Sequence, residues 1–164
     1  MNEVKVLVTG EAFIGGGCRS IDLVMEELVE GARNEIHLAT YLVTSSGILR
    51  RIRAAVERGV RVVAVINDLR GQPMFVRSEI VSLARSFPSF IVEDFSEQGA
   101  GMLHAKVLVV DRTEAIVGSA NLTDAAMDRN HEIAVLVRGA VADEIAQLVD
   151  GLISRRARLV TTRP

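Results

Sequence analysis

The chain has 164 residues, 49% of them hydrophobic, and a formal net charge of −2. This size and composition suit a globular fold with a substantial core, so we expect residues 1–164 to form a single domain and exclude a disordered chain. The near-neutral charge excludes binding to nucleic acid by bulk electrostatics. The lone cysteine, Cys18, excludes an internal disulfide framework, and no residue cluster has the spacing of a zinc site.

The first ten residues, MNEVKVLVTG, lack the basic and then apolar plan of a signal peptide. No apolar run is long enough to cross a bilayer. We therefore expect a cytoplasmic protein that does not associate with membranes.

Hydrophobic periodicity predicts strands and helices that alternate first and strands that follow one another later. The predicted elements, in chain order, are a strand at 4–8, a helix at 20–33, a strand at 35–43, a helix at about 46–58, a strand at 60–66, a helix near 76–86, a strand near 90–95, a glycine-rich loop at 96–101, strands at 102–110, 114–119 and 131–137, and a helix at about 140–157. This order predicts an α/β fold whose mixed sheet is parallel first and antiparallel later, with helices on both faces.

Two segments resemble known sites only superficially. VLVTGEAFIGGG follows a predicted strand, yet it has neither the G-x-G-x-x-G of a dinucleotide site nor the Gly-Lys-Ser/Thr of a phosphate loop, so we interpret it as a turn. His131-Glu132 lacks the second histidine of the zinc protease motif. No cofactor is expected.

Basic residues are grouped, with one group at 50–61 and another at 155–163. We interpret both as solvated helix faces, although a local patch that binds phosphates stays open as an alternative. Of the 19 basic residues only Lys5 and Lys106 are lysines.

The segment HAKVLVVDRTEAIVGSAN carries polar residues at the ends of two apolar runs. Residues two apart in a strand share a face, so His104 and Lys106 point one way, as do Ser119 and Asn121. A hairpin with a four-residue loop at 111–114 would set Lys106 opposite Ser119 and His104 opposite Asn121. The four side chains would then form one patch at the open end of the hairpin.

Such a patch suits a phosphate anion. Lysine is a compact cation, serine and asparagine are neutral donors, and histidine can attack phosphorus or carry a proton. No carboxylate cluster accompanies them, so we expect no metal.

The spacing H-x-K-x4-D-x6-G-S-x-N resembles the HKD signature of the phospholipase D superfamily. The residues that fill it here are His104, Lys106, Asp111, Gly118, Ser119 and Asn121. Asn130-x-Glu132 is similar to the trailing polar pair of that family. Ala39-Thr40-Tyr41, and Arg58-Gly59-Val60 before a strand that ends near Asp68, resemble further landmarks, so the resemblance covers nearly the whole chain.

The resemblance implies a phospholipase D-like fold and a catalytic set of His104, Lys106, Asn121 and Glu132. Lys106, Asn121 and also Ser119 would bind substrate, and Glu132 would hold the histidine in one tautomer.

Asp111 and Gly118 would be structural rather than catalytic, with Asp111 capping the hairpin turn. We interpret His37 and His131 as residues without a catalytic role.

Transfer through a phosphohistidine needs a nucleophile and an acid, and this family usually supplies them from two motifs. This chain has a single His-x-Lys. The resemblance therefore implies a homodimer whose twofold axis brings two His104 side chains together at one active site.

The resemblance favours an endonuclease that works without metal, because short members with one motif are mostly nucleases. We favour DNA over RNA, and a larger restriction or defence complex is possible. Two alternatives stay open: a phospholipase D-type lipid phosphodiesterase or transphosphatidylase, and a non-catalytic phosphate-binding module of a defence complex.

Overall fold

The computed structural model describes residues 2–13, 16–98 and 101–161. Their strands form one eight-stranded sheet in the order β2-β1-β8-β7-β6-β3-β4-β5. The strands are β1 (Glu3–Thr9), β2 (Arg19–Ser20), β3 (Glu35–Thr40), β4 (Arg61–Ile66), β5 (Phe90–Asp94), β6 (Lys106–Val110), β7 (Glu114–Gly118) and β8 (Glu132–Arg138). The helices are α1 (Ile21–Gly31), α2 (Ser46–Glu57), α3 (Met74–Ser86), α4 (Asp124–Asp128) and α5 (Ala140–Thr161).

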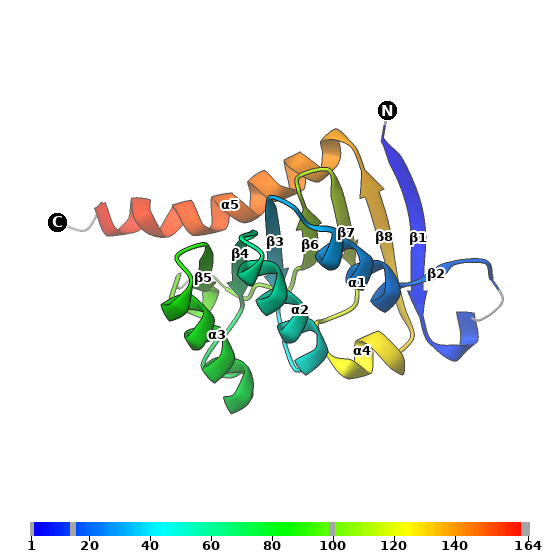
Figure 1. The fold of residues 1–164 in the computed structure, drawn as a ribbon, viewed down its shortest axis with the longest axis horizontal. Helices are drawn as coiled ribbons and strands as arrows, with labels where there is room; N and C mark the ends of the chain where they lie inside the picture. The colour runs from blue at the N-terminus through cyan, green and yellow to red at the C-terminus, as the bar shows by residue number, and fades with distance from the viewer. Residues whose placement is uncertain (1, 14–15, 99–100, 162–164) are drawn as a thin grey trace.

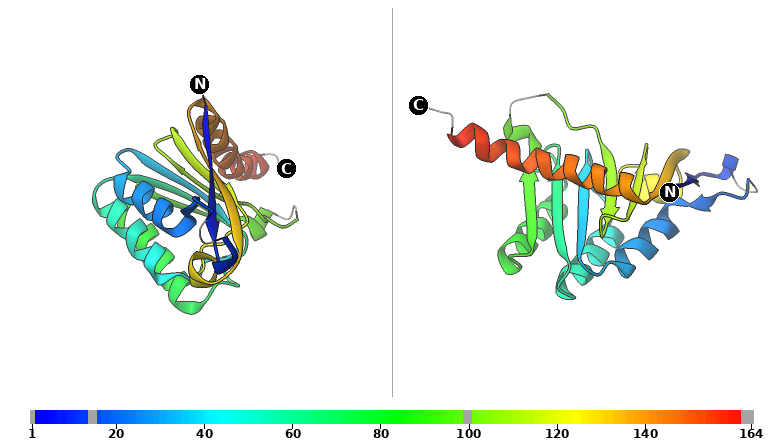
Figure 2. Two further views of the ribbon diagram at one scale, coloured as in Figure 1. Left: turned by 90° about the vertical axis from the view of Figure 1, so that its right-hand side faces the viewer. Right: turned by 90° about the horizontal axis from the view of Figure 1, so that it is seen from above.

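The sheet is mixed, as the sequence predicts. β3, β4 and β5 are parallel neighbours, whereas β6, β7 and β8 are antiparallel to the strands beside them. Helices α1, α2 and α3 cover one face and α5 crosses the other (Figures 1 and 2). The α/β class with helices on both faces is therefore confirmed.

Two apolar layers hold the sheet between its helices. The larger layer lies under α1, α2 and α3 and includes Ile21 and Val62, both fully buried. On the other face Val109 and Ala115 of the hairpin pack against Ala142 and Ala146 of α5. These small alanines let α5 approach the sheet closely, and close packing of this kind fixes the position of the hairpin.

Several predicted boundaries are wrong. β3 ends at Thr40 rather than at 43, and β6 starts at Lys106 rather than at 102, so His104 precedes the strand. The short β2 and α4, and the 3-10 turns Glu11–Phe13 and Phe95–Gln98, were not expected. Parts of the two glycine-rich segments, residues 14–15 and 99–100, lie outside the described residues.

No helix among the described residues has both the length and the apolar character needed to cross a bilayer.

Candidate active site

The HKD residues lie along one edge of the sheet. β3 and β7 end at this edge and β6 and β8 begin there, because the neighbours are antiparallel. Thr40, the last residue of β3, pairs with Lys106, the first residue of β6. Thr9, the last residue of β1, pairs with Glu132, the first residue of β8. The sheet therefore aligns residues that are far apart in sequence.

The predicted register of the hairpin is wrong by one residue. Val110 pairs with Glu114 rather than with Ala115, so the turn has three residues and Lys106 lies across from Gly118 instead of Ser119. The cause is backbone conformation: Asp111 and Arg112 have φ of 50° and 55°, in the left-handed region that tightens the turn.

Lys106 and His104 are in direct contact at the open end of the hairpin. The Lys106 ammonium donates to His104 Nε2 at 3.0 Å and to the His104 carbonyl oxygen at 2.9 Å. An ammonium can only donate, so Nε2 is the accepting nitrogen and carries a lone pair. Partial burial lowers the pKa of Lys106, an effect that the Glu132 carboxylate opposes.

Tyr41 is a site residue that sequence reasoning did not single out. Its ring meets the exposed His104 ring edge-on, with centroids 5.3 Å apart, and Lys106 Nζ lies 5.9 Å from the Tyr41 centroid. The ring limits the positions that both side chains can adopt. The signal in the sequence was the landmark Ala39-Thr40-Tyr41, but only the β3–β6 pairing shows the contact.

Among the described residues, Glu132 makes no hydrogen bond or ion pair with His104 of the same chain. Its carboxylate accepts hydrogen bonds from the Ser119 hydroxyl and, at 3.1 Å, from the Asn130 side-chain amide. Ser119 Oγ also accepts from the Ile133 N–H at 3.2 Å. A role of Glu132 in orienting a histidine stays a prediction.

Asn121 has unused hydrogen-bonding capacity. Its side-chain oxygen is buried and has no partner among the described residues. A buried polar atom without a partner is costly and rare, and where it occurs it often belongs to a functional site. The free acceptor of Asn121 would therefore suit only a group that carries an N–H or O–H donor.

Gly118 is required by packing. A Cβ built on it would lie 2.4 Å from Ala134 Cβ, 2.6 Å from Ala134 Cα and 2.6 Å from the Ile133 carbonyl oxygen. Two of these atoms belong to the backbone and cannot move aside. Glycine at this point of the motif lets β7 and β8 pair closely beside the site.

Asp111 closes the other end of the hairpin. Its carboxylate accepts three backbone hydrogen bonds, from Arg33 at 3.0 Å, Asn34 at 2.8 Å and Glu35 at 2.9 Å. Burial by itself would raise the pKa of this carboxyl group, but the three N–H donors outweigh it and lower the pKa. Asp111 thus ties the turn to the start of β3.

A second polar cluster extends from this turn to α5. Arg112 pairs with Glu35, with Asp143 at 3.0 Å and with Asp150 at 2.5 Å. The fully buried His37 contacts Asp150 through Nε2 at 3.1 Å, and burial lowers the pKa of its imidazole. His37 therefore belongs to a structural cluster, although its Nδ1 has no partner among the described residues.

His131, the other histidine that we assigned no catalytic role, packs at the end of β1. Its Nε2 accepts from the Ala12 N–H at 3.3 Å and its ring meets Phe13 edge-on.

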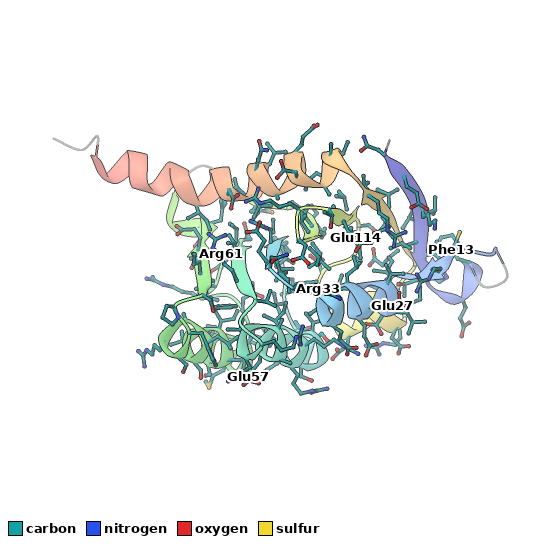
Figure 3. The ribbon with its side chains drawn as sticks, turned by 45° about the horizontal axis from the view of Figure 1, so that its top comes forward. Phe13, Glu27, Arg33, Glu57, Arg61 and Glu114 are labelled. Atoms are coloured by element: carbon teal, nitrogen blue, oxygen red, sulfur yellow. The ribbon has the colours of Figure 1, made fainter. Side chains whose placement is uncertain are left out.

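The arginines at 50–61 are largely engaged within the chain. Arg58 donates to the carbonyl oxygens of Val29 and Glu30. Ion pairs in this segment are Arg51–Glu26 at 2.5 Å, Arg53–Glu79 at 2.6 Å and Arg61–Glu35 at 3.2 Å, with Arg61 labelled in Figure 3. This pairing favours a solvated face over a phosphate-binding patch. The arginine side chains at 155–163 lie outside the described residues.

The described part of the chain contains no cluster of metal ligands. Within 2–13, 16–98 and 101–161, no three His, Cys, Asp or Glu side chains gather closely enough to bind a metal ion.

A family model described as "Cardiolipin synthase, PLD-like domain" matches residues 25–156. Cardiolipin synthase A of Buchnera aphidicola is 32% identical over 141 residues, which are 83% of this chain and 27% of that protein. The DISARM protein DrmC of Bacillus paralicheniformis is 32% identical over 142 residues, 84% of this chain and 58% of that protein. The chain therefore spans less than two thirds of the length of each of these relatives.

Solved structures share the fold along nearly the whole length of this chain. Nuc from Salmonella typhimurium, a phospholipase D family member, has a TM-score of 0.71 at 23% identity and covers 94% of this chain and 95% of its own. NucT from Helicobacter pylori has a TM-score of 0.73 at 17% identity, with 94% and 97% covered. TrmBL2, an archaeal chromatin protein, has a TM-score of 0.64 at 20% identity, over 92% and 52%.

Proposed function

This chain belongs to the phospholipase D superfamily, and we propose that it is a metal-independent endonuclease that cleaves DNA in preference to RNA. The observation that carries the proposal is a half-site on one chain. An exposed His104 is held by Lys106 at the open end of the hairpin, where β7 leads into Ser119 and Asn121. A phosphodiester offers negative oxygens that the Lys106 ammonium and the N–H groups of the Asn121 amide would engage, and an electrophilic phosphorus for His104.

In the first step His104 Nε2 attacks phosphorus with its lone pair. The N–P bond forms, the P–O bond to the leaving group breaks, and the partner's His104 donates a proton to the leaving oxygen. Lys106 moves its hydrogen bond from Nε2 to a non-bridging phosphate oxygen, where its charge offsets that of the phosphoryl group. The side-chain amide of Asn121 would donate to a second such oxygen.

In the second step water completes the hydrolysis. The partner's His104, now neutral, takes a proton from water, the hydroxide attacks phosphorus, and the N–P bond breaks. His104 is restored and no oxidant or metal is consumed. Both steps need two histidines at one phosphate, so the active species is a dimer.

Nucleic acid is favoured over lipid because one of the fold neighbours binds DNA. Nuc and NucT match this chain over 95% and 97% of their own lengths, so a unit of this size makes up nearly the whole of each of those chains. TrmBL2, the chromatin protein that shares the fold, binds DNA.

A lipid phosphodiesterase is the second candidate. The matching family model and the Buchnera relative both carry the name cardiolipin synthase.

The test is cleavage in excess EDTA. Purified protein is incubated with plasmid DNA, single-stranded DNA, RNA and phosphatidylglycerol vesicles, next to a His104→Ala variant. We expect cleavage of DNA by the wild type only. Turnover of vesicles alone would establish the lipid alternative, and no turnover of any substrate would support the non-catalytic module.

A mixing experiment tests the shared site. When wild-type and His104→Ala chains are unfolded together in equal amounts and refolded, about one quarter of the dimers carry two histidines. We expect activity near that quarter, whereas a site complete within one chain would retain about half.

A further inference from the structure

A groove of about 440 Å³ lies at the end of the sheet opposite to β1, beside α3 and β5 (Figure 1). It is lined by residues of α3, of the loop that follows β4 and of the end of β5. The polar residues of its lining are Arg70, Arg77, Ser78 and Asp94. None of the HKD residues lines it, so it is a feature separate from the candidate active site.

The register of the sheet ties this groove to the candidate active site. Lys106 of β6 pairs with Thr40 of β3. Thr40 pairs with Ile66 of β4, and Ile66 pairs with Asp94 of β5. Paired residues point to the same face of a sheet, so Asp94 lies on the same face as Lys106. Three strand spacings separate the two backbones by about 14 Å.

Arg77 lies at the end of α3 that borders this edge of the sheet. α3 connects the parallel strands β4 and β5, so it begins where β4 ends and runs back toward the start of β5. Arg77 follows three residues after Met74, which begins the helix, whereas Arg85 in the last turn lies about 12 Å further along the axis. One helix therefore carries an arginine near the candidate site and another far from it.

The guanidinium group of Arg77 is unpaired within the described part of the chain. Its Nε is buried and has no hydrogen-bond partner there, and no described carboxylate forms an ion pair with it. The carboxylate of Asp94, in the same groove, accepts from the N–H groups of Leu69 at 3.2 Å and Ser96 at 3.0 Å. Arg77 is half-buried and lines the groove, so an anion bound there would accept its free N–H donors.

The other lining residues favour one phosphate of a nucleic acid over a membrane surface. The Ser78 hydroxyl can donate to a phosphate oxygen, and the apolar side chains of Met74 and Val81 can contact the sugar beside it. Arg70 already has a partner within the chain, so it adds no free cation. Attachment to anionic lipid uses clusters of about four to eight cations, whereas one arginine fork suits a single phosphate.

We propose that Arg77 binds a second phosphate of the DNA strand that is cleaved at His104. The inference rests on the proposed function, because that function makes a polynucleotide the substrate, and a polynucleotide carries further phosphates along the same strand. Phosphates of one strand rise by about 3.4 Å each in B-DNA, so the separation of about 14 Å corresponds to roughly four nucleotides. The strand would extend from Lys106 across the ends of β3 and β4 to the groove.

The test measures binding of a fluorescent single-stranded DNA 12-mer by anisotropy in excess EDTA. All proteins carry His104→Ala, so that the DNA stays intact. Arg77→Gln removes the proposed contact, and Arg85→Gln is the matched control, because it removes the same charge from the other end of the same helix. The dissociation constant should rise about tenfold for Arg77→Gln and less than about twofold for Arg85→Gln.

The salt dependence of binding separates a direct phosphate contact from a change in net charge. The slope of log affinity against log salt concentration should decrease by about 0.7 in Arg77→Gln and stay unchanged in Arg85→Gln. Equal affinities and slopes in the two variants would overturn the proposed contact. A loss of binding to phosphatidylglycerol vesicles, without a loss of binding to DNA, would also overturn it and assign Arg77 to a lipid headgroup.

Circular dichroism checks folding. If Arg77→Gln does not fold, Arg77→Met replaces it, because methionine keeps much of the apolar length of the side chain without the charge. Failure of the proposed function looks different: DNA binding that depends on Arg77, without cleavage of any phosphodiester by the chain that retains His104, would establish the contact and refute the endonuclease. Absence of DNA binding by every protein would overturn both.

Discussion

The two ends of the β6–β7 hairpin carry parts of one motif but differ in how their polar groups are used. At the turn, Asp111 accepts three backbone hydrogen bonds and Arg112 makes three ion pairs. At the open end, His104 is exposed, and the Asn121 side-chain oxygen has no partner in the part of the chain that the structure describes. The polar groups of the turn bind residues 33–35 and α5, whereas those of the open end bind one another and leave the His104 ring exposed.

This difference predicts which residues of the signature are structural and which are chemical. A group whose hydrogen bonds are already made stabilises the fold, whereas an unsatisfied group has free energy to gain from a substrate. The comparison predicts that substitutions at the turn lower stability, while those at the open end lower activity.

The largest expected effect is that of His104→Ala. Turnover should fall by at least about 10⁴-fold, because the covalent intermediate then lacks its nucleophile. The free energy of unfolding should change by less than about 0.5 kcal/mol, since the ring is exposed. Cleavage rates and denaturant titrations provide the two measurements. A strongly destabilised variant would contradict the prediction that residues at the open end affect activity rather than stability.

Gly118→Ala tests whether the open end also contains a purely structural residue. A Cβ would overlap the backbone of β8, so the free energy of unfolding should fall by about 3 kcal/mol. Adding Ala134→Gly removes the contact at 2.4 Å but leaves that with the Ile133 carbonyl oxygen, and should restore only part of the loss. Full recovery of the free energy of unfolding in the double variant would show that the contact with the Ala134 side chain, and not that with the β8 backbone, causes the loss.

Asp111→Ala removes the acceptor that fixes the turn and should lower the free energy of unfolding by about 2 kcal/mol, with turnover per folded molecule retained. The lowered pKa sets the pH dependence. Asp111 stabilises the fold above its unfolded pKa of about 3.9, and this contribution disappears as pH falls through the lower folded value.

The difference in the free energy of unfolding between the wild type and Asp111→Asn, measured by denaturant titration, should therefore be largest at neutral pH and decrease in acid. A gap independent of pH would show that the carboxylate charge has no part in fixing the turn.

The smallest effect concerns the pH profile at Lys106. Burial lowers its pKa, so the cation that binds phosphate should be lost at a lower pH than for an ordinary lysine. An arginine in place of Lys106 stays charged to a higher pH, so in Lys106→Arg the loss of substrate affinity should begin at a higher pH than in the wild type. At neutral pH the variant should bind substrate more weakly, because the guanidinium group has a different shape from the ammonium group. Affinity for a non-cleavable phosphodiester, measured in both proteins, checks the shift, and an unchanged profile would assign the fall to another group.

Most of the architecture could be predicted from the sequence because apolar periodicity is a local property. Strands β4 and β5 and helices α1, α2 and α3 begin and end within a few residues of their predicted bounds. His104 was wrongly expected in a strand, because the apolar pattern continues through Leu103 although the ladder begins only at Lys106. Apolar periodicity indicates which residues are buried, but it does not indicate where the hydrogen bonds between strands begin.

By itself the sequence determined the α/β class and the single HKD signature, and it predicted which residues of that signature are structural and which are chemical. Only the tertiary structure decided the one-residue shift of the hairpin, the attachment of Glu132 to Ser119, the contact of Tyr41 with His104 and the exposure of Val4 and Val6 on β1. Each of these depends on segments far apart in the chain: Asp111 is held by residues 33–35, and α5 reaches only part of the sheet. Such contacts form when the chain folds, and no local pattern encodes them.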